Sequence, residues 1–303
     1  MTDRRKFLKS LLAASAGLGL FSGALPREQD KRRDGLFFDI SLAQWSLHKA
    51  LQSNRITNLD FPRITREKFD LAAVEYVSTF FRNTKTQYLS ELRNITVNEG
   101  INNVLIMVDG EGDLAETDPA GRKQSVENHF KWIDTAQYLG CQTIRVNARG
   151  RGSAKEVARA ATDGLSHLSE RAARSGINVV VENHGGYSSN GKWLAEVIRE
   201  VDMPNCGTLP DFGNFTIREG ETYDRYKGLR ELMPYAKGVS AKTYDFDESG
   251  HETTMDFKKI LTIVKQASYF GYIGIEYEGS RLSEEEGIRA TKDLLIRTGK
   301  ALS

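Results

Sequence analysis

Residues 177–186 read INVVVENHGG, and this stretch decides the fold class. Its valines form a short β-branched run that stops at Glu182 and is followed by two glycines, which is typical of a buried strand with a polar end. Three later segments repeat the pattern: CGTLPDFGNF reaches Asp211, AKGVSAKTYDF reaches Lys242 and YIGIEYEG reaches Glu276. In a (β/α)8 barrel the carboxyl ends of the strands carry the chemistry. The pattern therefore predicts a barrel with charged side chains at one mouth.

Outside these segments, the chain alternates short apolar runs with amphipathic stretches. Eight strands are predicted, at 37–45, 73–77, 102–108, 142–147, 177–183, 206–211, 237–242 and 272–278. Helical periodicity occurs at 64–71, 85–99, 122–139, 153–175, 191–201, 223–234, 255–269 and 283–301. This alternation, without hairpin signals between adjacent strands, indicates a parallel sheet, and eight units favour one (β/α)8 TIM barrel. The G-x-G-x-x-G fingerprint of a Rossmann fold does not follow the first strand.

The first residues of the chain indicate export. The sequence DRRKFLK at 3–9 contains a twin arginine, and a mild apolar stretch at 10–20 follows it. That stretch is short and rich in Gly and Ala, so it is typical of a signal peptide and not of a stable membrane anchor. We predict a twin-arginine signal peptide at 1–24, a flexible linker at 25–35, the barrel at 36–303, and a periplasmic or otherwise exported protein.

The charge balance argues against a nucleic-acid partner. The chain has 42 basic and 41 acidic residues, and without residues 1–24 it would have 38 and 40, a net charge of −2. A near-neutral surface lacks the basic footprint that nucleic-acid binding needs. The two cysteines, Cys141 and Cys206, lie next to strand patterns, and we expect buried thiols rather than a disulfide.

The segments ENHGG, LPDFGNF, AKTYDFD and GIEYEG give the chain a family resemblance. Over almost its whole length after the linker, it resembles the xylose isomerase-like TIM-barrel superfamily of the AP endonuclease 2 type. That group includes sugar epimerases, endonuclease IV-like proteins and inosose dehydratases. The resemblance implies that Glu182, Asp211 and Glu276, with a histidine on the seventh strand, would hold one divalent metal (Mn, Zn, Co or Mg). It also implies that the two glutamates move a proton at the carbon being inverted.

Two positions depart from that family pattern. Lys242 stands where the family keeps its metal-binding histidine, and Asn214 stands where it keeps a histidine three residues after the aspartate. The Lys242 ammonium could replace the metal in a salt-bridge cluster, act as a general base or electrostatic catalyst, or bind a substrate oxygen beside the metal. Nearby carboxylates raise the pKa of a lysine, which argues against the base role.

Further polar residues are predicted to surround this site. His184 faces the same side of its strand as Glu182, so it could be a fourth metal ligand, contact the substrate, or order the following Gly-Gly turn. Arg145 and Asn147 end the fourth strand and could bind sugar hydroxyls, although Arg145 could instead pair with an inner carboxylate. Glu278 shares a face with Glu276 and could bind hydroxyls, and Asn214 is a further candidate for substrate binding. Weaker candidates are Gln44, Trp45, Glu75 and Asp109, with Trp45 expected in the core rather than under a sugar.

Together these residues predict a sugar isomerase or epimerase acting on a neutral keto sugar or glycoside. Glu182 and Glu276 would be the acid/base pair, and a divalent metal or Lys242 would stabilise the enediolate. One alternative is lyase- or hydrolase-type cleavage of 3-keto glycosides on the same site. The other is a non-catalytic carbohydrate-binding barrel in which Lys242 has locked the carboxylates. The expected partner is a small-molecule carbohydrate, and a homo-oligomer is possible.

Overall fold

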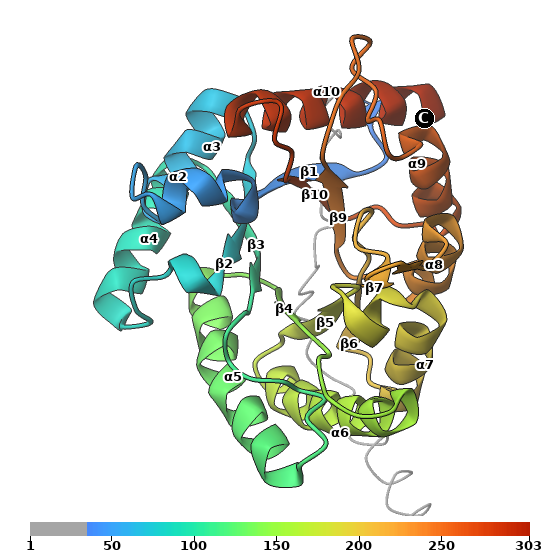
Figure 1. Cartoon of the computed structure of the whole chain (residues 1–303). Helices are drawn as coiled ribbons and strands as arrows, with labels where there is room; N and C mark the ends of the chain where they lie inside the picture. Colours follow the sequence, from blue (N-terminus) through green and yellow to red (C-terminus); the bar gives the residue numbers. More distant parts are fainter. Residues whose placement is uncertain (1–34) are drawn as a thin grey trace, which may run out of the picture. The chain divides into compact units, whose positions relative to one another are not determined.

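Eight parallel strands with helices between them make up residues 35–303, the part of the chain that this computed structural model describes (Figure 1). The barrel strands are β1 (Asp39–Ala43), β2 (Ala73–Val77), β3 (Asn102–Met107), β4 (Thr143–Val146), β5 (Asn178–Glu182), β6 (Cys206–Leu209), β9 (Val239–Thr243) and β10 (Tyr272–Tyr277). The signal peptide predicted at 1–24 and residues 25–34 of the predicted linker lie outside the described residues.

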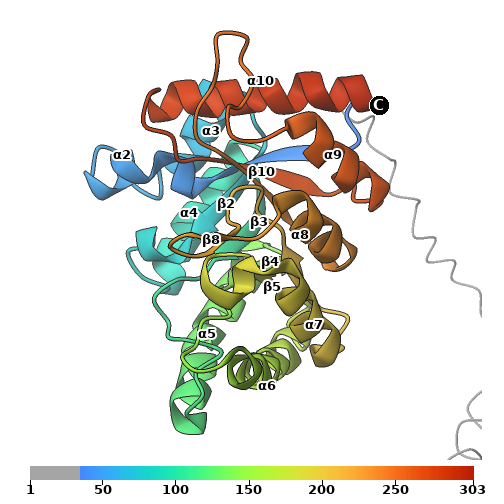
Figure 2. The same ribbon diagram turned by 45° about the vertical axis from the view of Figure 1, so that its right-hand side comes forward.

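Helices form a ring around the strands (Figure 1). They are α2 (His48–Gln52), α3 (Phe61–Phe69), α4 (Thr86–Asn98), α5 (Pro119–Leu139), α6 (Ala154–Ala173), α7 (Gly191–Val201), α8 (Arg225–Leu232), α9 (Phe257–Gln266) and α10 (Glu284–Leu302). Figure 2 shows the loop between β9 and α9 projecting past α10. None of the helices within residues 35–303 is long and apolar enough to span a membrane.

The sheet closes on itself. Its order is β6-β5-β4-β3-β2-β1-β10-β9, and all neighbouring pairs are parallel. The two ends meet through parallel bridges at Thr208–Ala236 and Asp211–Ser240. The Ser240 N–H donates to the Pro210 carbonyl at 3.0 Å, and the Phe212 N–H donates to the Ser240 carbonyl at 3.0 Å. The predicted (β/α)8 TIM barrel is therefore confirmed.

Alternating side chains along each strand build two apolar layers. In β5, Val179 and Val181 join the large core between the sheet and the helices. Val180 faces the other way, into a smaller cluster inside the barrel. The next inward position after Val180 is Glu182, so the interior changes from apolar to charged toward the carboxyl end of the strand. The members of the inner cluster are Ala43, Val77, Leu105, Met107, Val180 and Leu209.

The structure differs from the predicted elements mainly in the loops. It adds the short helix α2 after β1, and a hairpin of β7 (Thr216–Arg218) and β8 (Glu221–Thr222) after β6. The hairpin turn contains Gly220 with a φ of +74°, a backbone conformation that favours glycine. Hairpins were considered only between barrel strands, from Asn-Gly turns, so the β7–β8 hairpin within a single loop was not predicted. Strand β6 also ends at Leu209, which leaves Asp211 in the loop that follows.

Candidate active site at the barrel mouth

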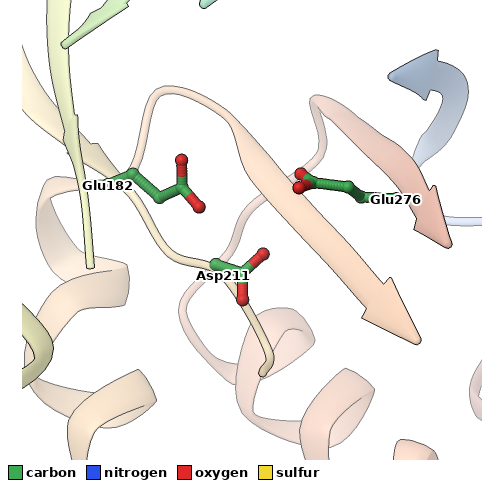
Figure 3. A group of neighbouring side chains, drawn as sticks. All are labelled: Glu182, Asp211 and Glu276. Carbon is green, nitrogen blue, oxygen red and sulfur yellow. The ribbon is translucent and has the colours of Figure 1, made fainter. Parts of the chain in front are cut away.

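Four neighbouring strand ends bring the predicted charged residues together. In the parallel pair β9–β10, Lys242 lies opposite Glu276. Glu182 is the last residue of β5, and Asp211 follows β6. Figure 3 shows the side chains of Glu182, Asp211 and Glu276 directed toward one another. Each offers an oxygen within 4.8 Å of the other two, so the three form a possible acidic metal site.

Lys242 supplies an ammonium to this cluster. Its Nζ lies 3.1 Å from Glu276 Oε1 and 3.2 Å from Glu278 Oε2, and it donates to Asn214 Oδ1 at 3.4 Å. The residue is only 1% exposed. Burial disfavours the charged amine, but the attraction of Glu276, Asp211, Glu182 and Glu278 prevails and raises the pKa of Lys242 well above its usual range. A lysine held in this way stays protonated and does not suit the role of a general base.

Glu276 is the carboxylate most affected by that ammonium. Its Oε1 faces Lys242, and its Oε2 accepts a hydrogen bond from Ser240 Oγ at 2.9 Å. Burial alone would raise the pKa of this carboxyl. The positive charges of Lys242 and Arg145 outweigh burial and lower the pKa of Glu276 below its usual value, so the group is ionised at neutral pH.

Glu182 is held by a different cation. Arg145 Nε and Nη2 both contact Glu182 Oε2, and Asn214 Nδ2 donates to Glu182 Oε1 at 2.8 Å. The third guanidinium nitrogen, Arg145 Nη1, lies 3.0 Å from Asp109 Oδ1. Arg145 is thus a partner of an inner carboxylate, one of the two roles predicted for it; the other, binding of sugar hydroxyls, stays a prediction. Asn214 contacts both Glu182 and Lys242, so it links the two ion pairs.

Asp211 differs from the two glutamates because no cation within residues 35–303 forms an ion pair with it. Its Oδ1 accepts the backbone N–H groups of Gly213 and Asn214, each at 2.8 Å. Its Oδ2 is buried and has no hydrogen-bond partner among the described residues. Burial raises the pKa of Asp211 above its usual range, and Glu182 and Glu276 add to the effect against the opposing charge of Lys242.

The sequence analysis missed the residue that positions Asp211. Asn183 Oδ1 accepts the Asp211 N–H at 2.8 Å, and Asn183 Nδ2 donates to the Asp211 and Asn214 carbonyls at 3.0 and 3.1 Å. Asn183 is fully buried. The sequence did contain a signal for this residue, because Asn183 directly follows Glu182 at a strand end. Successive side chains point to opposite sides of a strand, so Asn183 faces away from the mouth.

A cavity of about 690 Å³ opens above the charged cluster. Glu276, Glu278, Arg145, Asn147 and His184 all line it, whereas Glu182, Asp211 and Lys242 do not. Trp45, which was expected in the core, packs against the inner apolar cluster, and its half-buried ring also lines this cavity, with Nε1 donating to Glu278 Oε1. The ring is kept at the mouth by that hydrogen bond, which a sequence pattern cannot show.

His184 lies at the cavity wall, apart from the three carboxylates. Its Nδ1 is 2.9 Å from Arg149 Nη2 and 3.2 Å from Asn147 Oδ1. Its backbone N–H donates to Ser188 Oγ at 3.0 Å, so the residue also helps to order the turn after β5. Burial lowers the pKa of His184, and nearby cations outweigh the attraction of Glu182 and lower it further. The structure therefore presents a neutral imidazole to the cavity and does not place it among the clustered metal donors.

A further carboxyl, Glu75, lies inside the barrel. Its Oε1 accepts a hydrogen bond from Ser41 Oγ at 2.6 Å, and its Oε2 is buried without a partner among the described residues. A Cβ at Gly274 would lie 2.5 to 2.7 Å from the Glu75 carboxyl atoms, so any larger residue here would displace that carboxyl from its present position. Burial raises the pKa of Glu75 to about 8 despite the Ser41 hydrogen bond, and the charges of Glu276 and Glu182 contribute. Glu75 is thus a neutral acid at pH 7.

The donor set does not fit a divalent ion while Lys242 holds its place. Such an ion needs at least four ligand atoms, supplied by carboxylates, imidazoles or water. Glu276 already faces an ammonium, and Glu182 already faces a guanidinium. Only Asp211 Oδ2 is a buried oxygen of the cluster without a partner among residues 35–303. A divalent ion at this point would also be repelled by the Lys242 charge.

Known proteins resemble this chain over most of its length. The model of the family described as xylose isomerase-like TIM barrel matches residues 67–298. A D-tagatose 3-epimerase-like protein is 18% identical, with a TM-score of 0.69, and the match covers 88% of this chain and 100% of that one. A xylose isomerase-like TIM barrel protein from Mycobacterium smegmatis, solved in complex with magnesium, is 15% identical with a TM-score of 0.66, over 87% and 97% of the two chains.

Two further relatives have names that refer to glycosides. A 3-keto-D-glucoside 4-epimerase from E. coli, solved in its apo form, is 15% identical with a TM-score of 0.65, over 86% of this chain and 98% of that one. The C-glycoside deglycosidase alpha subunit of Arthrobacter globiformis is 37% identical over 54 residues, which are 18% of this chain and 15% of that protein's length. At these structural identities the likeness establishes the fold, while the reaction has to be argued from the site.

Proposed function

The chain belongs to the xylose isomerase-like TIM barrel family, and we propose that it is a sugar isomerase or epimerase acting on a neutral keto sugar or glycoside. The structural neighbours that are sugar epimerases support this class of reaction. The cavity wall supports a neutral substrate, since Asp109, Glu278, Arg145 and Asn147 offer hydrogen bonds of both kinds and both signs of charge.

The observation that carries the proposal is one ionised carboxylate at the floor of the cavity. Glu276 lines the cavity and has a lowered pKa, so it can accept a proton at neutral pH. The reaction breaks a C–H bond next to the substrate carbonyl, moves that proton to Glu276 and leaves an enediolate. Return of a proton on the opposite face forms the new C–H bond. Substrate and product are isomers, so no oxidant or reductant is consumed.

The second proton-transfer group is assigned to Glu182, following the pattern that the resemblance implies. Arg145 lines the cavity and contacts Glu182, which itself does not line it, so the guanidinium has to turn before Glu182 meets the substrate. His184 is the alternative, because its neutral ring lines the cavity directly. For the charge on the enediolate, Lys242 is one candidate cation and a divalent ion (Mn, Zn, Co or Mg) is the other.

Solvent deuterium exchange tests the proposed reaction. We expect the protein in D₂O to replace the hydrogen next to the carbonyl of a neutral keto sugar or 3-keto glycoside, and proton NMR measures the loss of that signal. Formation of the epimer at a matching rate identifies an epimerase. Binding of the same sugars without exchange would support the carbohydrate-binding barrel instead and overturn the proposal.

A second candidate is cleavage of 3-keto glycosides, in which the same proton abstraction is followed by loss of the group on the neighbouring carbon. The short match to a deglycosidase subunit supports it. So does a second cavity of about 610 Å³, which shares Gln52 and Thr79 with the first. Two adjacent cavities suit a sugar that carries a second group. Release of a free aglycone in the NMR experiment would separate this reaction from epimerisation.

The ring of Phe80 is predicted to contact that second group. Phe80 lines the second cavity, and its centroid lies 6.0 Å from that of Trp45 in the first. We expect Phe80→Ala to raise KM for a 3-keto glycoside roughly tenfold, the effect of lost apolar contact in a pocket, and to leave KM for a free keto sugar unchanged. Val97→Ala, on an exposed position of α4, is the control. Equal effects on both substrates would argue against an aglycone in this cavity.

A further inference from the structure

We propose that the ammonium of Lys242 is the permanent cation of this site, and that the protein works without a divalent metal. The inference rests on the proposed function in one respect, since it takes Glu276 to be the proton-transfer group. Three carboxylates here could hold a metal, but the Lys242 ammonium contacts one of them, Glu276.

The contacts of Lys242 satisfy an ammonium completely. An ammonium has three N–H donors, and Nζ has three oxygen partners: Glu276 Oε1 at 3.1 Å, Glu278 Oε2 at 3.2 Å and Asn214 Oδ1 at 3.4 Å. Two of these partners carry negative charge. A buried ammonium that is ion-paired and fully hydrogen-bonded is stable in this position. A metal ion could replace it only by breaking these contacts.

The aliphatic part of Lys242 is held as firmly as its charged end. A Cβ at Gly213 would lie 3.1 Å from both Cγ and Cδ of Lys242 and 2.8 Å from Tyr244 Oη. Glycine at position 213 therefore lets the loop after β6 lie directly against the lysine stem. The same loop supplies Asn214 to the ammonium and Asp211 to the cluster. The loop thus packs closely against the Lys242 side chain. Such packing is expected of a cation with a fixed position, because a lysine that moved aside for a metal would lose it.

Four carboxylates around the cavity floor each contact a cation of the protein itself. Arg145 faces Glu182 and Asp109, and Lys242 faces Glu276 and Glu278. Asp211 Oδ2, the oxygen of the cluster that has no partner among the described residues, is compatible with a protonated carboxyl. A doubly charged ion within a few ångströms of Nζ would have to displace the ammonium from at least one carboxylate.

Lys242 is on this account a positioning residue. It does not line the cavity and acts through Glu276, whose carboxylate it orients and keeps ionised. Its positive charge also lies next to the place where the enediolate charge develops. A substrate in the cavity would contact Glu276, while the Lys242 ammonium lies beneath that carboxylate.

Metal analysis of the whole protein tests the inference without any substrate. The protein is prepared without chelator from medium containing Mn, Zn, Co and Mg, and its metal content is measured by mass spectrometry. Zinc and manganese are then titrated by calorimetry into the unaltered protein, Lys242→His, Lys242→Met and the exposed control Lys300→Met. We expect well under one equivalent of metal in the unaltered protein, and at least tenfold tighter zinc binding by Lys242→His.

About one equivalent of metal in the unaltered protein, removed by chelator together with a fall in Tm, would overturn the inference. This arm decides the matter even if the Lys242 variants do not fold. Where they fold, a Lys242→Arg variant is expected to recover part of the deuterium exchange that Lys242→Met loses, because it restores a cation. Two results would count against the inference. One is that Lys242→Arg recovers no deuterium exchange. The other is that added metal raises the exchange rate of Lys242→Met to that of the unaltered protein with the same metal.

The two proposals fail in different ways. A metal-free protein that exchanges no deuterium into any keto sugar would leave the lysine inference standing and remove the isomerase. A protein that exchanges deuterium only after loading with Mn or Zn would keep the isomerase and remove the lysine inference.

Discussion

Glu276→Gln is expected to lower the rate of solvent deuterium exchange by about 10²–10⁴-fold, the usual contribution of a positioned general base. Glutamine keeps the size of the side chain; its amide oxygen can accept from Lys242 in place of Oε1, and its NH2 group can donate to the Ser240 hydroxyl in place of Oε2. It cannot take a proton. The loss should therefore lie in kcat, with KM for the keto sugar changed little. Exchange followed by proton NMR measures both.

The neighbouring carboxylates provide the comparison for that result. Glu278→Gln changes the other carboxylate that contacts Lys242, and it should lower the rate far less. Glu170→Gln, on an exposed position of α6, should have no effect. A Glu276→Gln protein that is folded and retains more than roughly a tenth of the rate would remove Glu276 from proton transfer. In that case His184→Asn is the next variant to measure, because the neutral ring of His184 also lines the cavity.

The fold could be predicted because local patterns and the global topology agree. The runs around Val179 to Val181 alternate between an outer and an inner layer, and every barrel strand lies within a few residues of its predicted position. Eight such runs separated by amphipathic helices leave few topologies other than a closed parallel barrel. The β7–β8 hairpin was missed because it belongs to a loop, where turn chemistry and not periodicity decides the structure.

The site was predictable as a set of residues but not as a set of contacts. Strand ends identify Glu182, Asp211, Lys242 and Glu276, because the carboxyl ends of parallel strands meet at one edge. Which cation faces which carboxylate depends on register and side-chain reach. Arg145 contacts Glu182 from the adjacent strand β4, while Lys242 lies across from Glu276 in β9–β10. Neither pairing can be read from spacing in the sequence.

Glu75 illustrates a second limit of sequence reasoning. It looked like a weak candidate for the site, yet the structure gives it full burial and, among the described residues, one side-chain hydrogen bond, from Ser41. Its environment is set by Gly274 on β10, a strand about 200 residues further along the chain. A carboxyl enclosed in this way has an energetic effect that depends on pH, and that effect can be measured independently of any substrate.

Glu75→Gln is expected to stabilise the protein at alkaline pH and to have little effect on stability in acid. The pKa of Glu75 is raised from 4.5 to about 8 in the folded protein. Below pH 4.5 the carboxyl is protonated in both the folded and the unfolded chain, so it adds no pH dependence. Between about 4.5 and 8 the unfolded chain releases the proton while the folded protein keeps it, and stability falls by up to about 1.4 kcal/mol per pH unit. Above pH 8 the loss is complete.

Glutamine cannot ionise, so this loss is absent in the variant. The stability difference between Glu75→Gln and the unaltered protein should grow through that pH window and level off at on the order of 4 kcal/mol. Denaturant unfolding at half-unit steps from pH 4.5 to 9 measures it, with Glu170→Gln as the exposed control that should show no such window. The glutamine amide can still accept the Ser41 hydrogen bond, so packing is nearly unchanged. A difference that is flat with pH would mean that Glu75 is ionised in the folded barrel at pH 7. An ionised Glu75 would add a buried negative charge whose Oε2 has no partner among the described residues, and this would count against the metal-free account of Lys242.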